Sequence, residues 1–220
     1  FLIRKADHLI LSAPLPAAVN LRLASLFSLA FERTVEGQAL DINLRGSADI
    51  NLELYLRIVE LKTAHYLALT WVGGAVVAGV SDAAVDLLQD LGRSLGPAFQ
   101  IRDDIIDLTQ GKGRGGEIGC DLREGKPSIF FAYVLERQKG TEAERRRLVE
   151  IVSKEREATT REDVEWAIDF YRKTGALEFA EEMARDLLRK ADGIIDRLPF
   201  AAEGKEVFQA VSRFMIDRSH

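Results

Sequence analysis

Three aspartates stand close together in the segment FQIRDDIID, residues 99–107. In a helix, Asp103 and Asp107 lie on one face, one turn apart, with Asp104 beside them. Like charges at this spacing cost about 0.2–0.5 kcal/mol, and the C-terminal end of a helix also disfavours negative charge. Magnesium would offset both effects, because it prefers carboxylate oxygens and is usually held by one or two carboxylates together with substrate phosphates. We therefore predict a Mg2+ site here; a solvated acidic helix end is the alternative.

Two other polar groups interrupt apolar helical patterns. Lys62 and Thr63 fall within the sequence LRIVELKTAHYLAL. The lysine either extends along the surface to solvent or offers a point charge to a phosphate, with a hydroxyl beside it. Gly37, Gln38 and Asp41 lie where another apolar helix turns polar, and taken alone this pattern favours a kink or a helix end at the glycine.

A glycine-rich segment, GKGRGGEIGCDLREGKPS, covers residues 111–128. It contains GxGxxG, but this pattern follows a predicted helix and not a strand, which argues against a dinucleotide-binding site. It also misses the phosphate-binding P-loop pattern, because Pro127 stands where serine or threonine is required. What remains is a loop with four cations beyond the aspartates, which suits closure over a phosphorylated ligand. These cations are Lys112, Arg114, Arg123 and Lys126.

The elements that must position these residues are all predicted to be helices, because apolar residues recur at helical spacing and no useful period-2 alternation occurs. We expect long helices over residues 1–13, from 17 to beyond 36, over 51–79, and from 81 through the aspartates. Residues 110–127 are expected to be irregular. Shorter helices follow, two of them after capping boxes at Thr141 and Thr160, and then helices over 177–198 and 205–216. The chain reads as one all-α domain, residues 1–220.

Composition narrows the function. The net charge of −5 argues against nucleic acid as a partner. The single cysteine, Cys120, excludes an internal disulfide framework and fits a reducing compartment such as the cytoplasm. The apolar run over residues 66–80 is shorter than the roughly 20 residues of a transmembrane helix, so we predict no transmembrane segment. Phe1 begins inside a helical pattern without an initiator methionine, so we expect a longer parent chain.

Together, GQALD, KT, FQIRDDIID and GxxGxDLxEGK occur in an order that resembles the trans-isoprenyl diphosphate synthases, or polyprenyl synthetases. The resemblance extends over essentially the whole chain, to the ending RFMIDR. It implies an isoprenoid-synthase-type bundle of long antiparallel helices around a central cavity. It also implies a homodimeric, Mg2+-dependent prenyltransferase that condenses isopentenyl diphosphate with an allylic diphosphate.

The resemblance assigns a role to each matching residue. Asp103, Asp104 and Asp107 match the family's second aspartate-rich motif, which holds magnesium against the allylic diphosphate. Lys62 matches the lysine that contacts this diphosphate, and Lys126 matches a loop lysine that closes on it. The other matching positions are Thr63 beside Lys62, Gln100 and Phe99 at the reaction centre, and Gln38 and Asp41 at the polar end of the preceding helix. Glu117 departs from the family, which often has lysine there; Lys112 or Arg114 would have to compensate.

The family's first aspartate-rich motif has no counterpart, since DDxxD occurs once in this sequence. About the first third of a family member is therefore expected to be missing. Three functions stay open: a prenyltransferase given as part of its chain, a non-catalytic subunit or lipid-diphosphate-binding protein, and a related terpene synthase that uses one aspartate-rich motif. Product length is not readable from these residues.

Overall fold

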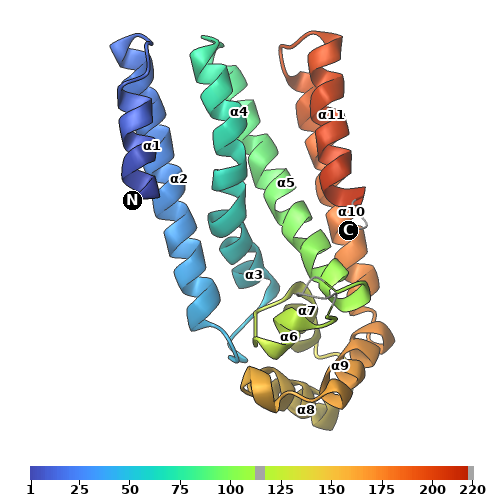
Figure 1. Cartoon of the computed structure of the whole chain (residues 1–220). Coiled ribbons are helices and arrows are strands. Elements are labelled where there is room, and N and C mark those ends of the chain that lie inside the picture. Colours follow the sequence, from blue (N-terminus) through green and yellow to red (C-terminus); the bar gives the residue numbers. More distant parts are fainter. Residues whose placement is uncertain (112–116, 218–220) are drawn as a thin grey trace.

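The protein is a bundle of long helices closed at one end by short ones (Figure 1). The computed structural model describes residues 1–111 and 117–217, and within them no β-strand occurs. The all-α class is therefore confirmed. The elements of the bundle are α1 (Leu2–Leu11), α2 (Ala17–Asn43), α3 (Leu52–Val59), α4 (His65–Val77), α5 (Asp82–Thr109), α10 (Ala176–Arg197) and α11 (Ala202–Asp217). The elements at its closed end are α6 (Cys120–Arg123), α7 (Ile129–Glu136), α8 (Glu142–Val152), the 3-10 turn η2 (Arg156–Ala158) and α9 (Arg161–Lys173).

Helix starts follow the capping residues. The side chains of Asn51, Ser81 and Ser128 accept backbone N–H groups at the starts of α3, α5 and α7. Thr141 and Thr160 form complete capping boxes before α8 and α9, as predicted. These caps satisfy amide groups that have no partner within the helix.

Two apolar clusters hold the helices together. One fills the upper bundle between α4, α5 and α10, with Val72, Leu91 and Ile195 at its centre. The other joins α3 and the lower half of α5 to α7, α9 and α10, around Phe130 and Tyr171. Helix α5 takes part in both clusters, so its C-terminal end is fixed where the long helices meet the short ones. No helix in the described part of the chain is long and apolar enough to cross a membrane.

Three expectations about the elements were wrong in part. Helix α2 does not end at Gly37 but continues to Asn43. The predicted helix 51–79 is interrupted by a π-helical turn, η1 (Glu60–Ala64). The segment expected to be irregular contains α6, and α11 begins three residues earlier than predicted. The first two differences share a cause, because Gly37 packs against the backbone of η1.

Candidate functional site

A cavity of about 140 Å³ lies beside the C-terminal end of α5. Its walls come from α2, α3, η1, α5, α6 and the segment between α6 and α7. Six charged side chains line it: Asp41, Lys62, Asp103, Asp104, Asp121 and Lys126. The structure thus brings the first two aspartates of FQIRDDIID together with two predicted diphosphate-binding lysines, Lys62 and Lys126.

Lys62 lies in the π-helical turn η1 and lines this cavity. A π turn inserts one extra residue into the helical register, and such turns are frequent at functional sites. The turn is held between two glycines of neighbouring helices: a Cβ on Gly37 of α2 would lie 2.5 Å from the Lys62 backbone nitrogen, and one on Gly96 of α5 would lie 2.6 Å from the Ala64 Cα. Both positions exclude any larger residue in this packing. The Lys62 ammonium lies 3.3 Å from Asp41 Oδ2.

Asp104 is held from two sides. The Tyr55 hydroxyl donates to its Oδ2 at 2.8 Å and Gln100 Nε2 donates to its Oδ1 at 3.1 Å. Burial, together with the neighbouring Asp104 charge, raises the pKa of Tyr55 well above its ordinary value. The phenol therefore stays protonated and remains a donor to the carboxylate. Tyr55 was not predicted as a site residue; its spacing of seven before Lys62 is that of an ordinary core residue.

Asp107, the third aspartate of the motif, is not among the residues that line the cavity. Its Oδ1 accepts the Cys120 backbone N–H at 3.1 Å, and its Oδ2 accepts that of Asp121 at 3.0 Å. The side chain is 1% exposed. Burial, with the Asp107 charge next in importance, raises the pKa of the Cys120 thiol. The role that the structure gives to Asp107 is to fix the start of α6; its prediction as a metal ligand stays a prediction.

Asp121 is a site residue that the sequence reasoning missed. It is 6% exposed, lines the cavity and forms an ion pair with Lys126, whose ammonium also lies 3.4 Å from Glu124. Its position five residues before the predicted lysine, within DLREGK, was the available signal. Lys126 follows Gly125, which has a positive φ of 61° and lies against the backbone of Gly46 and Val152. The lysine therefore extends from a tightly packed turn.

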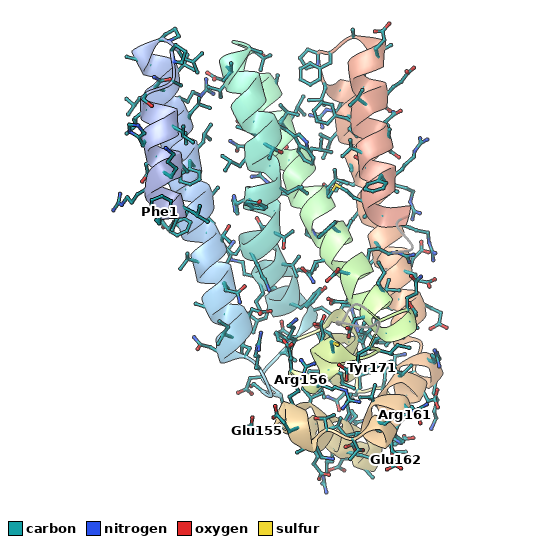
Figure 2. All side chains as sticks on the ribbon, viewed as in Figure 1. Phe1, Glu155, Arg156, Arg161, Glu162 and Tyr171 are labelled. Carbon is teal, nitrogen blue, oxygen red and sulfur yellow. The ribbon has the colours of Figure 1, made fainter. Side chains whose placement is uncertain are left out.

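Glu117, the departure from the family pattern, forms ion pairs with two arginines. Its carboxylate pairs with Arg123 Nε at 3.1 Å and with Arg156 at 3.3 Å. Arg156, labelled in Figure 2 at the lower end of the bundle, also contacts Glu124 at 2.8 Å. Arginines thus neutralise the negative charge at Glu117, and it is not among the residues that line the cavity.

The remaining predicted residues do not line the cavity or lie outside the described residues. Thr63, Gln38 and Phe99 are half-buried, and none of them is among the cavity-lining residues of the described chain. Lys112 and Arg114 lie outside the described residues. Their predicted contact with a diphosphate stays a prediction.

The carboxylates of Asp103 and Asp104 suit a magnesium ion that is held jointly by the protein and by substrate phosphates. Among the described residues, no group of three or more His, Cys, Asp or Glu side chains is arranged to hold a metal ion. Magnesium does not need such a group, because substrate phosphates and water complete its octahedral coordination. Asp103 and Asp104 supply carboxylate oxygens of the right chemistry beside two ammonium groups. Asp41 Oδ2 is also buried without a hydrogen-bond partner among the described residues, so the cavity wall contains an anionic group with unused acceptor capacity.

Comparison with known proteins agrees with this arrangement. The family described as polyprenyl synthetase matches residues 2–171. The chain belongs to the polyprenyl synthetase family. Over 186 residues it is 32% identical to a short chain isoprenyl diphosphate synthase of Methanothermobacter thermautotrophicus, a match that covers 84% of this chain and 55% of the relative. Over 217 residues it is 30% identical to a geranylfarnesyl diphosphate synthase of Natronomonas pharaonis, covering 98% of this chain and 60% of the relative.

Solved structures of polyprenyl synthetase relatives have the same fold. A geranylgeranyl pyrophosphate synthase from Corynebacterium glutamicum, complexed with isoprenyl diphosphate and magnesium, superposes with a TM-score of 0.88 at 28% identity, over 98% of this chain and 60% of that one. A geranylgeranyl pyrophosphate synthetase from Pyrococcus horikoshii gives 0.84 at 27% identity, over 98% and 64%. The isoprenoid-synthase-type fold is therefore confirmed. The chain spans about 60% of the length of such relatives.

Proposed function

We propose that this chain carries one half of the active site of a magnesium-dependent prenyltransferase. The substrates would be isopentenyl diphosphate and an allylic diphosphate, joined into a trans-polyprenyl diphosphate of geranylgeranyl or farnesyl type. One observation carries the proposal: Asp103 and Asp104 share a cavity with Lys62 and Lys126. Carboxylates that attract a divalent cation, next to ammonium groups that attract phosphate oxygens, are what a metal-bound diphosphate requires.

The residues can be assigned roles in such a reaction. Departure of the diphosphate from an allylic carbon leaves a delocalised carbocation, and the double bond of isopentenyl diphosphate attacks that carbon before a proton is lost. Lys62 and Lys126 would stabilise the negative charge that develops on the leaving diphosphate. Asp103 and Asp104 would hold Mg2+, which supplies electrostatic stabilisation of the same charge when bound. Gln100 would keep Asp104 oriented, and Thr63 and Phe99 would lie near the reacting carbons.

The proposal is tested first by binding and then by turnover. Calorimetric titration of the 220-residue chain with pyrophosphate should show binding with MgCl2 and much weaker binding with EDTA. Lys62→Met should weaken the magnesium-dependent binding, while Lys190→Met, on the exposed surface of α10, should not. Binding that is equally strong in EDTA, or unaffected by Lys62→Met, would contradict the proposal. Labelled isopentenyl diphosphate with an allylic primer then tests for an extended prenyl product.

A second candidate function is binding of a lipid diphosphate without turnover, as a subunit of a catalytic partner. The observation that favours it is the same cavity, because Asp103, Asp104, Lys62 and Lys126 can hold a magnesium-bound diphosphate without any reaction taking place. Magnesium-dependent pyrophosphate binding without product formation would support this function. Formation of product by the chain alone would exclude it.

We also propose that the protein acts as a homodimer in the cytoplasm. The dimer is supported by apolar side chains exposed on α1 and α2, among them Leu9, Leu21, Leu29 and Val35. In Figure 1 these two helices form the outer edge of the bundle. Light scattering coupled to gel filtration should give twice the chain mass; a monomer at all concentrations would contradict the dimer. The single cysteine supports the compartment, which cell fractionation would test.

A further inference from the structure

The cavity is lined by two lysine–aspartate pairs that come from different elements of the fold. In the first pair, Lys62 of η1 lies 3.3 Å from Asp41 of α2. In the second, Lys126 forms an ion pair with Asp121 of α6. Both aspartates are 6% exposed, whereas the lysine side chains retain 29% and 27% exposure. Each ammonium is therefore bound at the cavity wall by a buried anion, while part of its surface faces the cavity.

The first pair depends on one face of α2. Gly37 and Asp41 are four residues apart, so they lie on the same side of that helix. Gly37 lets the η1 backbone approach, since its missing Cβ would lie 2.5 Å from the Lys62 nitrogen. One turn further along, Asp41 meets the end of the same lysine side chain. The only other cation near Asp41 in the described chain is Arg45, at the longer distance of 3.9 Å.

The second pair depends on Asp107. Its carboxylate fixes the backbone of Cys120 and Asp121, and the Lys126 backbone N–H returns to the Asp121 carbonyl at 3.0 Å. The turn from Asp121 to Lys126 is thus closed by backbone and side-chain contacts together. The position of the second ammonium is set by α5 through Asp121, just as that of the first is set by α2 through Asp41.

We propose that Asp41 and Asp121 are positioning residues for the two lysines, and that each acts on diphosphate binding through its own lysine. A lysine side chain has four rotatable bonds and three N–H donors. A buried carboxylate that attracts the ammonium restricts the side chain to the cavity wall before the ligand is bound. Such pre-organisation raises affinity because the ordering cost is already met before the ligand arrives. This inference rests on the proposed diphosphate-binding function.

The alternative to a positioning role is that each aspartate simply repels the diphosphate. A carboxylate near a diphosphate anion weakens its binding by Coulomb's law, and removing that charge would then strengthen binding. The positioning role and repulsion predict opposite effects of the same aspartate-to-asparagine substitution on diphosphate affinity: the first lowers the affinity and the second raises it. They also differ in coupling, because a residue that acts through its lysine has no effect once that lysine is gone.

Double-mutant cycles on the 220-residue chain decide between them, with magnesium pyrophosphate as the ligand and the dissociation constant as the readout. We expect Asp41→Asn to weaken binding about fivefold and Lys62→Met about tenfold or more, with the double variant no weaker than Lys62→Met alone. Asp121→Asn and Lys126→Met should behave in the same way. The crossed combinations, Asp41→Asn with Lys126→Met and Asp121→Asn with Lys62→Met, are the matched controls, and their effects should multiply.

The outcomes separate the inference from the function on which it rests. No magnesium-dependent binding by the unsubstituted chain would contradict the proposed function itself. Binding with effects that multiply within each pair, or tighter binding by Asp41→Asn, would overturn only the positioning role. Circular dichroism establishes that each variant is folded. If Asp41→Asn unfolds the chain, two other measurements replace it. The Asp121–Lys126 cycle tests the coupling within a pair, and Asp41→Glu should retain most of the affinity for magnesium pyrophosphate; multiplying effects in the cycle, or loss of affinity in a folded Asp41→Glu, would overturn the positioning role.

Discussion

Asp107 caps the segment that contains Asp121: its Oδ2 accepts the Asp121 backbone N–H at 3.0 Å, while its Oδ1 accepts that of Cys120. One aspartate of the motif thus orders the chain that delivers another carboxylate and, five residues on, a lysine to the cavity. The three aspartates of the motif therefore occupy different positions. Asp103 and Asp104 line the cavity, whereas Asp107 is buried and does not line it.

We predict that Asp107→Asn destabilises the protein. The amide has one acceptor oxygen in place of two, so one buried backbone N–H loses its partner, at a cost of about 2 kcal/mol in the free energy of unfolding. Urea unfolding measures this cost, and hydrogen exchange should show faster exchange of the Cys120 and Asp121 amides. Asp86→Asn, at an exposed position on the same helix, is the control and should stay within about 0.5 kcal/mol. Equal stability of the two variants would show that the cap is not needed.

Gly37→Ala should also destabilise, although alanine normally favours a helix. The new methyl group would lie 2.5 Å from the Lys62 nitrogen and 2.8 Å from the Leu61 Cβ, so α2 and η1 must separate. Such overpacking costs about 1–3 kcal/mol in the free energy of unfolding. Gly74→Ala is the matched control, because no atom lies within 4 Å of its Cβ position, and it should stabilise by about 0.5–1 kcal/mol. Urea unfolding of both variants measures the change in the free energy of unfolding. A change of the same sign in both variants would refute this account of Gly37.

These packing relationships explain which parts of the structure could be read from the sequence. The helices that begin at Ser81, Thr141 and Thr160 were predictable because a cap is local: the side chain and the amide it satisfies are three residues apart. The conjunction of Lys62, Asp103 and Lys126 was reached only through the order of the family motifs. Helical periodicity places residues on a face but does not say which faces meet.

The features missed were those that depend on contact between distant segments. Gly37 reads locally as a helix breaker, and only its approach to η1 shows why α2 continues past it. Tyr55 looks like an ordinary core residue in the sequence, and its ring is indeed buried. Its hydrogen bond to Asp104 joins residues that are 49 positions apart, so the local sequence does not indicate it. The π turn lies where Gly37 and Gly96 allow two other helices to approach the backbone of η1, and such contacts between distant segments are not visible in the local sequence.

Tyr55→Phe tests the contact that holds Asp104. Removing the hydroxyl takes away a charge-assisted hydrogen bond to Asp104 Oδ2 and should lower the free energy of unfolding by about 1.5–3 kcal/mol. The ring still fills its place in the core, so the loss comes from the hydrogen bond and not from a cavity. Tyr66→Phe, at a position that is 65% exposed, serves as the control and should change stability little. Comparable unfolding midpoints for both variants would mean that Asp104 does not depend on the phenol.

The last prediction concerns acid and the capping box of α8. Glu144 has its pKa lowered to about 2, chiefly by its hydrogen bond from Lys173, at 2.6 Å, and then by Thr141. A carboxyl whose pKa is lower in the folded than in the unfolded chain stabilises the fold above the unfolded value, near 4.3. That contribution is lost as the pH falls from about 4.5 towards 2. Glu144→Gln should therefore be less stable than the natural protein at pH 6 and should lose less stability between pH 6 and pH 3.5. Urea unfolding at both pH values tests this, with Glu150→Gln, exposed on the same helix, as the control. A Glu144→Gln difference that stays constant between the two pH values would show that the carboxylate has the same pKa in the folded and unfolded chain.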